Sequence, residues 1–515
     1  MRFQAKNRLN NSFLIIISGL LLSLFSFKST AQSYNNDGDS LFASSAIHTV
    51  YFNFYHTSFY DSLTASKISD EYYTCNMIVD GVHFDSVGVK FKGNSSYGIA
   101  NQKKSMKVDL DINIDGQDID DLNKFNLNNL YHDPTGVREK ILSDFAVKNS
   151  IPAPRVAYAK VYYNNAYWGL YTLVEEVNKD FIDGWFNDQV GNLFKGDPSG
   201  DLRWINSSPS SYYPKYELKT NETANDWSDL VGFIDKINNT PISGLRDTLD
   251  NNLDVTGFLK SWAICNIFVS LDSYIGSKHN YYIYHDSTDN RFKWIMWDLN
   301  SCFGVFNQNM TVAQMENLSL NYLSAPATSH PLCFRLLEDV ATKNELYSWF
   351  CTFLENDQFS NEHLDPIIDS LTNRIRADIF ADPNFTYSDQ QFEDNRTLTV
   401  LADNKSYPGL KTFISNRRTA LFNALSSFGC SAGLNQEEQE TFLVYPNPSC
   451  KEITIQIENP FEKTTISLSD LSGRVVLTKT SENANSVILD VSTLNSGTYI
   501  LTLNKNNFVK LQVDH

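Results

Sequence analysis

The stretch that decides the fold is residues 279–304, HNYYIYHDSTDNRFKWIMWDLNSCFG. Within each of two runs, aromatic and apolar residues alternate with polar residues. The two runs flank a polar turn, which is the pattern of a β-hairpin. The second run ends on Asp298, with Asn300 and Gly304 close behind. An acid, an amide and a glycine after a strand indicate either a catalytic feature or a polar turn, and the choice depends on the rest of the chain.

Composition places broad limits on function. The chain has 515 residues, enough for two or three domains, and 42 % of them are hydrophobic, which is ample for packed cores. Asp and Glu number 60 against 42 Lys and Arg, a formal charge of -18. Non-specific nucleic-acid binding needs clustered Lys and Arg, so we expect no nucleic-acid partner. Phosphate chemistry would need a local basic patch or a bound divalent metal.

The first 31 residues have the pattern of a signal peptide. A basic start is followed by the apolar run FLIIISGLLLSLFSF at 13–27 and by small residues in STA at 29–31. A membrane anchor is the alternative, but the run is short for a span of about 20 residues. We therefore expect cleavage, export and no stable transmembrane span after cleavage.

Seven cysteines are scattered along the chain without a CxxC pair, which argues against a structural zinc site. Export would permit one to three disulfides, and the odd number leaves at least one thiol outside any intrachain pairing. Several of them could equally be buried small hydrophobic residues. The spacing does not determine the connectivity.

The composition and residue pattern of the chain change twice along its length. Residues 45–429 form a body that is rich in strands in its first half and in helices in its second, which predicts an α+β fold with polar residues where the halves meet. Residues 430–441 are polar and acidic and have the composition of a linker. Short alternating strands between Gly, Asn, Pro and Ser at 442–515 predict a small all-β sandwich.

A loop in the body could bind phosphate. The segment VKFKGNSSYGIANQKKSMKVDL, 89–110, predicts a strand, a loop with Ser95 and Ser96, and a strand preceded by Lys103 and Lys104. Backbone N–H groups, hydroxyls and a nearby lysine suit a phosphate, but the pattern is not a Walker A loop. The alternative is an ordinary hairpin turn.

An acidic pair follows a predicted strand in WGLYTLVEEV, 168–177. Alternation puts Glu175 and Glu176 on opposite faces, so one of them should point inward. A buried carboxylate needs a cation, and Lys103 or Lys104 is the candidate. The alternative is an edge-strand Glu in water.

An acidic residue precedes the hairpin at 279–304 in the sequence. Asp272 comes first, Asn280 follows eight residues later, and Asp298 ends the hairpin. Protein kinases use this order of residue types, with an Asp as base and then an Asn and a second Asp on Mg²⁺. Residue types alone leave a capped helix and a polar turn as the alternative.

Two parts of the chain resemble known families. The motifs VYPNPS, LSDLSGRVV and LNSGTYIL, with a closing Lys510, resemble the C-terminal sorting domain of type IX secretion cargo. KGNSSYG…KKSMKVDL, LNNLYHDPTGVREKIL, GLYTLVEEV and the hairpin resemble the spore coat protein H (CotH) kinase family, with core motifs over 50–307 and a helical extension over 308–429. The first likeness implies a cell-surface or secreted location and the type IX machinery as a partner.

The kinase resemblance implies a two-lobed, atypical protein-kinase-like fold that transfers phosphate from ATP to Ser or Thr of a protein substrate, with Mg²⁺ or Mn²⁺. It implies these roles by position: Asp272 as catalytic base; Lys103 or Lys104 on the nucleotide phosphates beside Ser95 and Ser96, with Glu175 as the orienting partner; Asn280, Asp298 and Asn300 at the metal.

One position departs from the family, which commonly reads W-D-L-D where this chain has Trp297, Asp298, Leu299 and Asn300. An amide oxygen can still bind a metal, but the change removes one negative charge. A non-catalytic surface pseudokinase, adhesin or assembly protein with the same fold is therefore the alternative to an enzyme.

Overall fold

The computed structural model describes residues 37–43, 45–430, 442–457, 464–470, 474–481, 484–503 and 507–514. The predicted signal peptide at 1–31 and nearly all of the predicted linker at 430–441 lie outside these residues. Within the described part of the chain, none of the helices combines the length and apolarity needed to span a membrane. Helices and strands are mixed, and the strands form several separate sheets.

The first half of the body is a closed barrel whose strands follow the order β1-β2-β3-β4-β5-β7-β6. All neighbours are antiparallel except β1 and β6, which close the barrel in parallel. Alternate residues of β1, such as Val50 and Phe52, are fully buried, as expected when inward side chains fill a small barrel. The strands are β1 (Ile47–Asn53), β2 (Tyr73–Val79), β3 (Val82–Phe91), β4 (Met106–Asp109), β5 (Lys124–Asn128), β6 (Val156–Tyr163) and β7 (Ala166–Glu175).

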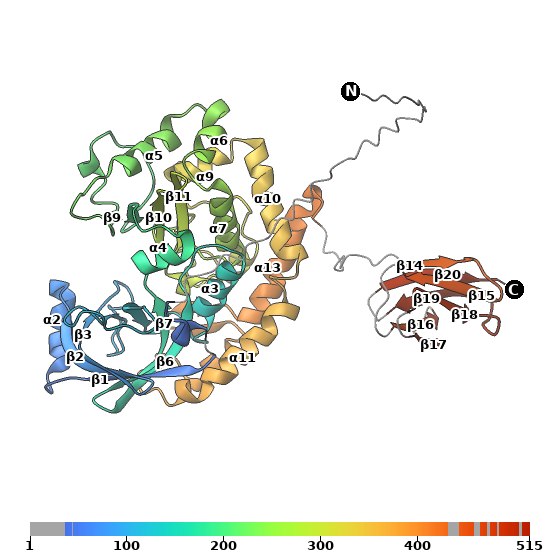
Figure 1. The fold of residues 1–515 in the computed structure, drawn as a ribbon, viewed down its shortest axis with the longest axis horizontal. Helices are drawn as coiled ribbons and strands as arrows, with labels where there is room; N and C mark the ends of the chain where they lie inside the picture. Colours follow the sequence, from blue (N-terminus) through green and yellow to red (C-terminus); the bar gives the residue numbers. More distant parts are fainter. Residues whose placement is uncertain are drawn as a thin grey trace, which may run out of the picture.

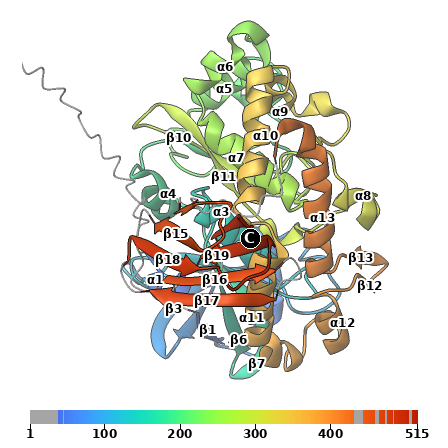
Figure 2. The same ribbon diagram turned by 90° about the vertical axis from the view of Figure 1, so that its right-hand side faces the viewer.

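Helices cover the barrel and make up most of the rest of the body. Figure 1 shows the barrel at one end, helices α5 and α6 at the other, and β10, β11 and α3 between them. Figure 2 shows α10, α11 and α13 along one side. The helices are α1 (Asp39–Phe42), α2 (Phe59–Ser69), α3 (Arg138–Lys148), α4 (Lys179–Phe186), α5 (Ser228–Asn239), α6 (Ile242–Asp250), α7 (Val255–Ile267), α8 (Val312–Glu316), α9 (Pro331–Leu336), α10 (Val340–Glu355), α11 (Asn361–Phe380), α12 (Asp389–Asp394) and α13 (Leu410–Leu425), with short 3₁₀ turns η1 (Pro209–Ser211), η2 (Leu299–Ser301), η3 (Ala327–Ser329) and η4 (Ser426–Phe428).

The opening stretch is a hairpin of β10 (Tyr281–Asp286) and β11 (Arg291–Met296), in a sheet completed by β8 (Leu193–Lys195) and β9 (Glu217–Leu218). Successive side chains of a strand point to opposite faces. Tyr281, Ile283 and Trp294 therefore join the large helical core, whereas Tyr282 and Ile295 join a second core with residues of β6, β7 and α4. Both faces are buried, which explains why tyrosines stand at positions where an exposed face would carry charged residues.

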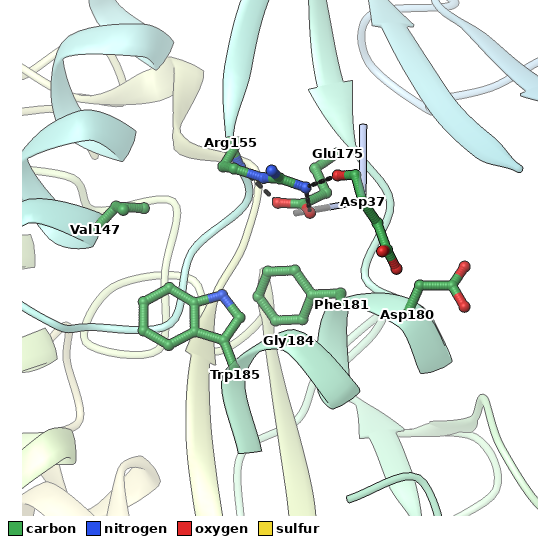
Figure 3. Close-up of a pocket in the computed structure, with 8 residues that line it drawn as sticks. All are labelled: Asp37, Val147, Arg155, Glu175, Asp180, Phe181, Gly184 and Trp185. Atoms are coloured by element: carbon green, nitrogen blue, oxygen red, sulfur yellow. Dashed lines mark hydrogen bonds and ion pairs between the residues drawn. The ribbon is translucent and has the colours of Figure 1, made fainter. Parts of the chain in front are cut away.

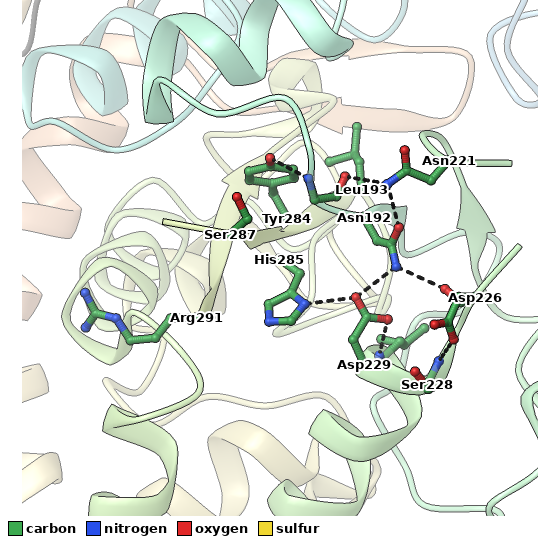
Figure 4. A network of polar contacts seen from close by, with 12 residues as sticks. Asn192, Leu193, Asn221, Asp226, Ser228, Asp229, Tyr284, His285, Ser287 and Arg291 are labelled. Carbon is green, nitrogen blue, oxygen red and sulfur yellow. Dashed lines mark hydrogen bonds and ion pairs between the residues drawn. The ribbon is translucent and has the colours of Figure 1, made fainter. Parts of the chain in front are cut away.

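A polar network braces the far end of this hairpin (Figure 4). His285 Nδ1 lies 3.0 Å from Asp229 Oδ2 at the start of α5, and Asn192 Nδ2 donates to the same carboxylate oxygen over 3.0 Å. Asn221 donates to the Asn192 amide oxygen over 2.9 Å. These bonds tie the turn end of β10 to the start of α5 and to the segment before β8.

The C-terminal segment contains two antiparallel sheets that share one hydrophobic cluster. Alternate residues of β15, such as Ile453 and Ile455, point into that cluster. A three-stranded sheet contains β14 (Phe442–Tyr445), β15 (Glu452–Ile457) and β18 (Ser486–Asp490); a four-stranded sheet contains β17 (Val475–Ser481), β16 (Thr464–Asp470), β19 (Gly497–Leu503) and β20 (Asn507–Val513). A small separate hairpin in the body pairs β12 (Val400–Ala402) with β13 (Lys405–Tyr407).

Candidate active site

At the open end of the hairpin, the residue before β10 and the second residue after β11 both have a left-handed backbone conformation. Asn280, just before β10, has φ 58°, and Asp298, just after β11, has φ 55°. A residue other than glycine in this left-handed region costs of the order of 1 kcal/mol, and such residues cluster at functional sites. Tyr281 is paired with Met296, so the hairpin places Asn280 and Asp298 at the same end of the sheet.

Asp272 reaches this end from the segment that follows α7. Its carboxylate Oδ1 lies 2.6 Å from His279 Nε2, and its backbone oxygen accepts a hydrogen bond from Asn280 Nδ2 over 2.9 Å. Burial lowers the pKa of His279, but the hydrogen bond and the charge of Asp272 outweigh burial and raise it overall. The pair therefore holds Asp272 in one orientation.

Asp298 lies in the field of these groups. Burial and the charge of Asp272 raise its pKa, while Lys92, Lys195 and His279 lower it less. Among the residues that the structure describes, no side chain or backbone N–H makes a hydrogen bond or ion pair with the Asp298 carboxylate. Two neighbouring carboxylates, one of them unpaired, form a site that favours a divalent cation.

Lys92, which follows β3, lowers the pKa of Asp298 more than any other cation does, and it was not among the residues singled out from the sequence. Its Nζ donates to Asn126 Oδ1 over 2.9 Å and to Asn128 Oδ1 over 3.3 Å. It lies 5.2 Å from the centre of the Trp297 ring. Burial lowers its pKa, while the charges of Glu176, Asp298 and Glu139 raise it. Lys92 is thus a half-buried cation surrounded by acidic groups.

Lys103 and Lys104 lie elsewhere, and the pairing predicted for them is wrong. Lys103 Nζ binds Asp382 Oδ2 over 2.6 Å, and both side chains are almost fully buried, with exposed fractions of 1 % and 0 %. Lys104 Nζ donates to the backbone oxygens of Tyr97 and Ile99. The strand that follows these lysines directs Lys103 toward the segment after α11, so it cannot meet a glutamate at the end of β7.

Glu175 has a different cation from the one predicted. Its carboxylate binds Arg155, with 2.5 Å from Arg155 Nη2 to Glu175 Oε1, and Arg155 also binds Asp39 over 3.1 Å. Glu175 and Arg155 line a small pocket with the rings of Phe181 and Trp185 (Figure 3). This pocket is formed by other elements than the hairpin end, so the structure does not bring Glu175 to Asp298.

Glu176 is the acid that faces Lys92. Its Oε2 accepts from Asn126 Nδ2 over 2.7 Å, so Asn126 bridges the Glu176 carboxylate and the Lys92 ammonium. Its other oxygen binds Lys107 Nζ at 2.6 Å. The sequence predicted that one of the two glutamates would point inward, but both are buried, and strand alternation alone could not tell which one would meet the site lysine.

A second buried acid, Glu139 on α3, was also missed. Its carboxylate accepts from Asn128 and from Thr172, at 2.8 and 2.7 Å. Burial is the main reason that its pKa rises to about 7, and the charge of Asp298 adds to it. Glu139 lies within VREKIL, at the end of the motif LNNLYHDPTGVREKIL, and the motif by itself assigns it no role.

The loop residues Ser95 and Ser96 follow Lys92 directly. Gly93 has φ +89°, and a Cβ there would lie 2.2 Å from Ser96 Oγ, so only glycine allows this turn. The Ser96 backbone oxygen accepts from Asn129 Nδ2 over 3.3 Å. Ser95 is exposed and Ser96 half-buried. The tight turn therefore keeps the loop close to the lysine that precedes it.

Asn300 lies in η2, two residues after Asp298, and is half-buried. Its amide oxygen accepts a hydrogen bond from Ser301 Oγ over 3.1 Å. A carbonyl oxygen has a second lone pair and can bind another donor or an ion at the same time. The position is compatible with a metal ligand, but it supplies no charge.

On another side, Asp272 faces a basic and aromatic patch. Lys405 Nζ lies 3.0 Å from His132 Nδ1, and the His132 ring stacks on Tyr131 with 3.6 Å between centroids. Burial lowers the pKa of Lys405 to about 8, although the charge of Asp272 opposes the shift. This patch joins the β12–β13 hairpin to the segment between β5 and α3, and no sequence motif indicated that they would meet.

Comparisons with known proteins identify the family to which the chain belongs. Residues 89–421 match the family described as "CotH kinase protein", which is more than half of the chain, and the protein belongs to that family. The match spans the loop after β3, the hairpin and Asp298. Residues 443–513 match the "Secretion system C-terminal sorting domain", which indicates export by type IX secretion to the cell surface.

Relatives share this region at low identity. "Inner spore coat protein H" of Bacillus subtilis is 26 % identical over 271 residues, covering 50 % of this chain and 70 % of that protein. "Invasin CotH7" of Rhizopus delemar is 22 % identical over 280 residues, covering 52 % of this chain and 44 % of that protein. A solved structure, the "Helicobacter pylori proinflammatory kinase CtkA", aligns over 67 % of this chain and 97 % of its own with a TM-score of 0.28 and 10 % identity.

Proposed function

We propose that the protein is an exported protein kinase that transfers a phosphoryl group from ATP to Ser or Thr of a surface or secreted protein, with Mg²⁺ or Mn²⁺. In this proposal the barrel and the helical half are the two lobes of a kinase-like fold. The observation that carries it is the meeting of Asp272, Asn280, Asp298 and Lys92 at one end of the hairpin, since phosphoryl transfer needs a base, hard oxygen ligands and a cation for the phosphates.

The oxygen-rich end of the hairpin fits a magnesium ion. The carboxylate of Asp298 and the amide oxygens of Asn280 and Asn300 are the ligand types that Mg²⁺ and Mn²⁺ prefer, and Asp298 has no protein partner among the described residues. When bound, the ion would neutralise charge on the phosphates. Asp272, oriented by His279, would accept the proton of the attacking hydroxyl.

Lys92 would bind the nucleotide phosphates. The bridge through Asn126 to Glu176 orients its ammonium group, as a buried acid does in other kinases. The loop that holds Ser95 and Ser96 follows directly and supplies N–H and hydroxyl donors. The family resemblance implied these roles for Lys103 or Lys104 and for Glu175, but Lys103 binds Asp382, Lys104 binds two backbone carbonyls and Glu175 binds Arg155.

A non-catalytic role is favoured by one observation, the amide at Asn300. A site with one charge fewer could bind a nucleotide or metal without turnover, which would make the protein a surface pseudokinase, adhesin or assembly factor. Measuring phosphoryl transfer from labelled ATP by the full-length protein, with and without Mg²⁺ or Mn²⁺, separates the two functions.

Replacing Lys92 by Met is expected to weaken ATP binding by about 10- to 100-fold, because one hydrogen bond to a charged group is worth about 1.5–3 kcal/mol. Lys104→Met is the matched control, since its ammonium group is bound by two backbone carbonyls. Titration of a fluorescent ATP analogue against each variant measures the change. Loss of binding in Lys104→Met alone would return the phosphate contact to Lys104.

Replacing Asn300 by Asp is expected to raise the affinity for Mn²⁺ by about 10-fold, because ligand charge is a main determinant of affinity at hard-cation sites. Isothermal titration with Mn²⁺ in the presence of a non-hydrolysable ATP analogue measures it. If Asn300→Asp leaves both metal affinity and phosphoryl transfer unchanged, position 300 does not contribute to the site.

A further inference from the structure

Two cysteines meet where the body of the protein ends. Cys351 lies near the end of α10, and Cys430 is the first residue of the predicted linker, directly after η4 and Gly429. Their sulfur atoms and a carboxylate oxygen of Glu355 all lie within 4.8 Å of one another. Both cysteines are buried in the helical core and lie far from the hairpin in the sequence.

The fold positions this pair through two neighbouring contacts. Tyr347 and Cys351 are four residues apart on α10, so they share one face of that helix. The Tyr347 ring meets Phe428 edge-on, with 5.7 Å between centroids. Gly429 then adopts φ 88°, ends η4 and turns the chain so that Cys430 reaches the next turn of α10. The approach of the two sulfurs is thus set by the backbone on both sides.

We propose that Cys351 and Cys430 form a disulfide in the exported protein, which fastens the end of the body to α10. Export to the cell surface takes the chain into an environment where disulfides persist. The inference depends on this export and is independent of kinase activity. The proposed bond pairs two of the seven cysteines. It also explains why Cys430, at the start of the linker, lies against α10.

The reaction needs an external disulfide as oxidant, supplied by a protein or a small molecule. One cysteine, as its thiolate, attacks the oxidant and forms a mixed disulfide, and one thiol leaves. The second cysteine then attacks that bond, the Cys351–Cys430 bond forms, and a second thiol leaves. Two thiols thus lose two protons and two electrons in total, and the oxidant's disulfide is reduced to two thiols.

A metal ion is the competing occupant, because two thiols and a carboxylate could bind zinc. The surroundings favour the disulfide. Burial raises the pKa of the Cys430 thiol, and the neighbouring Cys351 and Glu355 raise it further. A structural zinc site almost always has four protein ligands, and the described residues offer three here, whereas a disulfide needs only the two sulfurs and is neutral.

The closed loop would span about 80 residues, long enough for a cross-link to restrict the unfolded chain substantially. The cross-link would keep the end of α13 and η4 attached to α10 when the linker is pulled or cut. Loss of either cysteine is therefore expected to lower the melting temperature of the body by about 5 °C.

The test uses the full-length protein, purified by export into the bacterial periplasm and alkylated without reduction. Trypsin must be combined with a Glu-specific protease, because the tryptic peptide 419–451 contains both Cys430 and Cys450. We expect a Cys351–Cys430 cross-linked peptide by mass spectrometry that disappears on reduction and in Cys351→Ser and Cys430→Ser, but not in Cys450→Ser.

The double variant should melt at the same temperature as each single variant, because both remove one bond. Alkylation of both thiols without prior reduction would overturn the proposal. So would one equivalent of zinc per chain that depends on Cys351, since that result would assign the cluster to a metal.

Discussion

Asp298→Ala is expected to reduce phosphoryl transfer by on the order of 10³-fold or more, because it removes the only negatively charged ligand we propose for the metal. The wild-type carboxylate is unpaired among the described residues, and burial beside Asp272 raises its pKa. An unpaired carboxylate next to a second carboxylate is electrostatically unfavourable, and a bound divalent cation would remove this repulsion. The substitution should also remove the dependence of ATP binding on Mn²⁺.

The measurement compares transfer from labelled ATP to the protein itself or to a model Ser/Thr substrate, with full-length wild type and variant. Asp85→Ala is the matched control, because Asp85 is exposed on β3 and lies on the barrel. Folding of each variant is checked by its melting temperature. Equal transfer by wild type and Asp298→Ala would refute the catalytic site; absence of both transfer and metal-dependent ATP binding in wild type would refute the proposed function.

Lys103→Met is expected to lower the free energy of unfolding by about 3 kcal/mol or more and to leave the ATP affinity of the folded protein unchanged. It would leave the buried Asp382 carboxylate without its cation, and breaking one partner of a buried pair typically costs about 3–5 kcal/mol. Asp382 also accepts hydrogen bonds from the backbone N–H groups of Leu170 and Asn384, which limits the loss.

Urea unfolding of the body, followed by tryptophan fluorescence, measures this effect. Lys160→Met is a matched control at the same junction of barrel and α11, since Lys160 and Asp378 are partly exposed and 3.8 Å apart, and it should cost less than about 1 kcal/mol. A Lys103→Met protein of normal stability but without ATP binding would show that Lys103 acts at the nucleotide and not in the packing.

Much of the framework could be predicted from local pattern. The strand-rich first half of the body, the hairpin within 279–304 and the C-terminal β-sheets have strong apolar alternation, and each was expected where it occurs. The acids at the hairpin end were identifiable because position within a hairpin is a local property: Asn280 stands before one strand and Asp298 after the other. The signal peptide remains a prediction.

Local sequence pattern could not predict which lysine lies beside the acids of the hairpin. Lys92, Lys103 and Lys104 lie within 13 positions of sequence, Lys92 directly after β3 and the other two shortly before β4. Which of them meets an acid depends on the curvature of the barrel and on the acid that β7 presents. Lys92 reaches Asn126 on β5 and the field of Glu176, whereas Lys103 is directed to Asp382, almost 280 positions later.

The sequence by itself determined the elements, the sorting domain and the acids of the hairpin, because these follow from short-range periodicity and contiguous motifs. Only the tertiary structure decided which lysine lies beside them, which glutamate is bridged to that lysine through Asn126, and that Cys351 lies next to Cys430. Those choices depend on contacts between segments distant in the chain, where burial requires each charge or thiol to find a partner that no local pattern specifies.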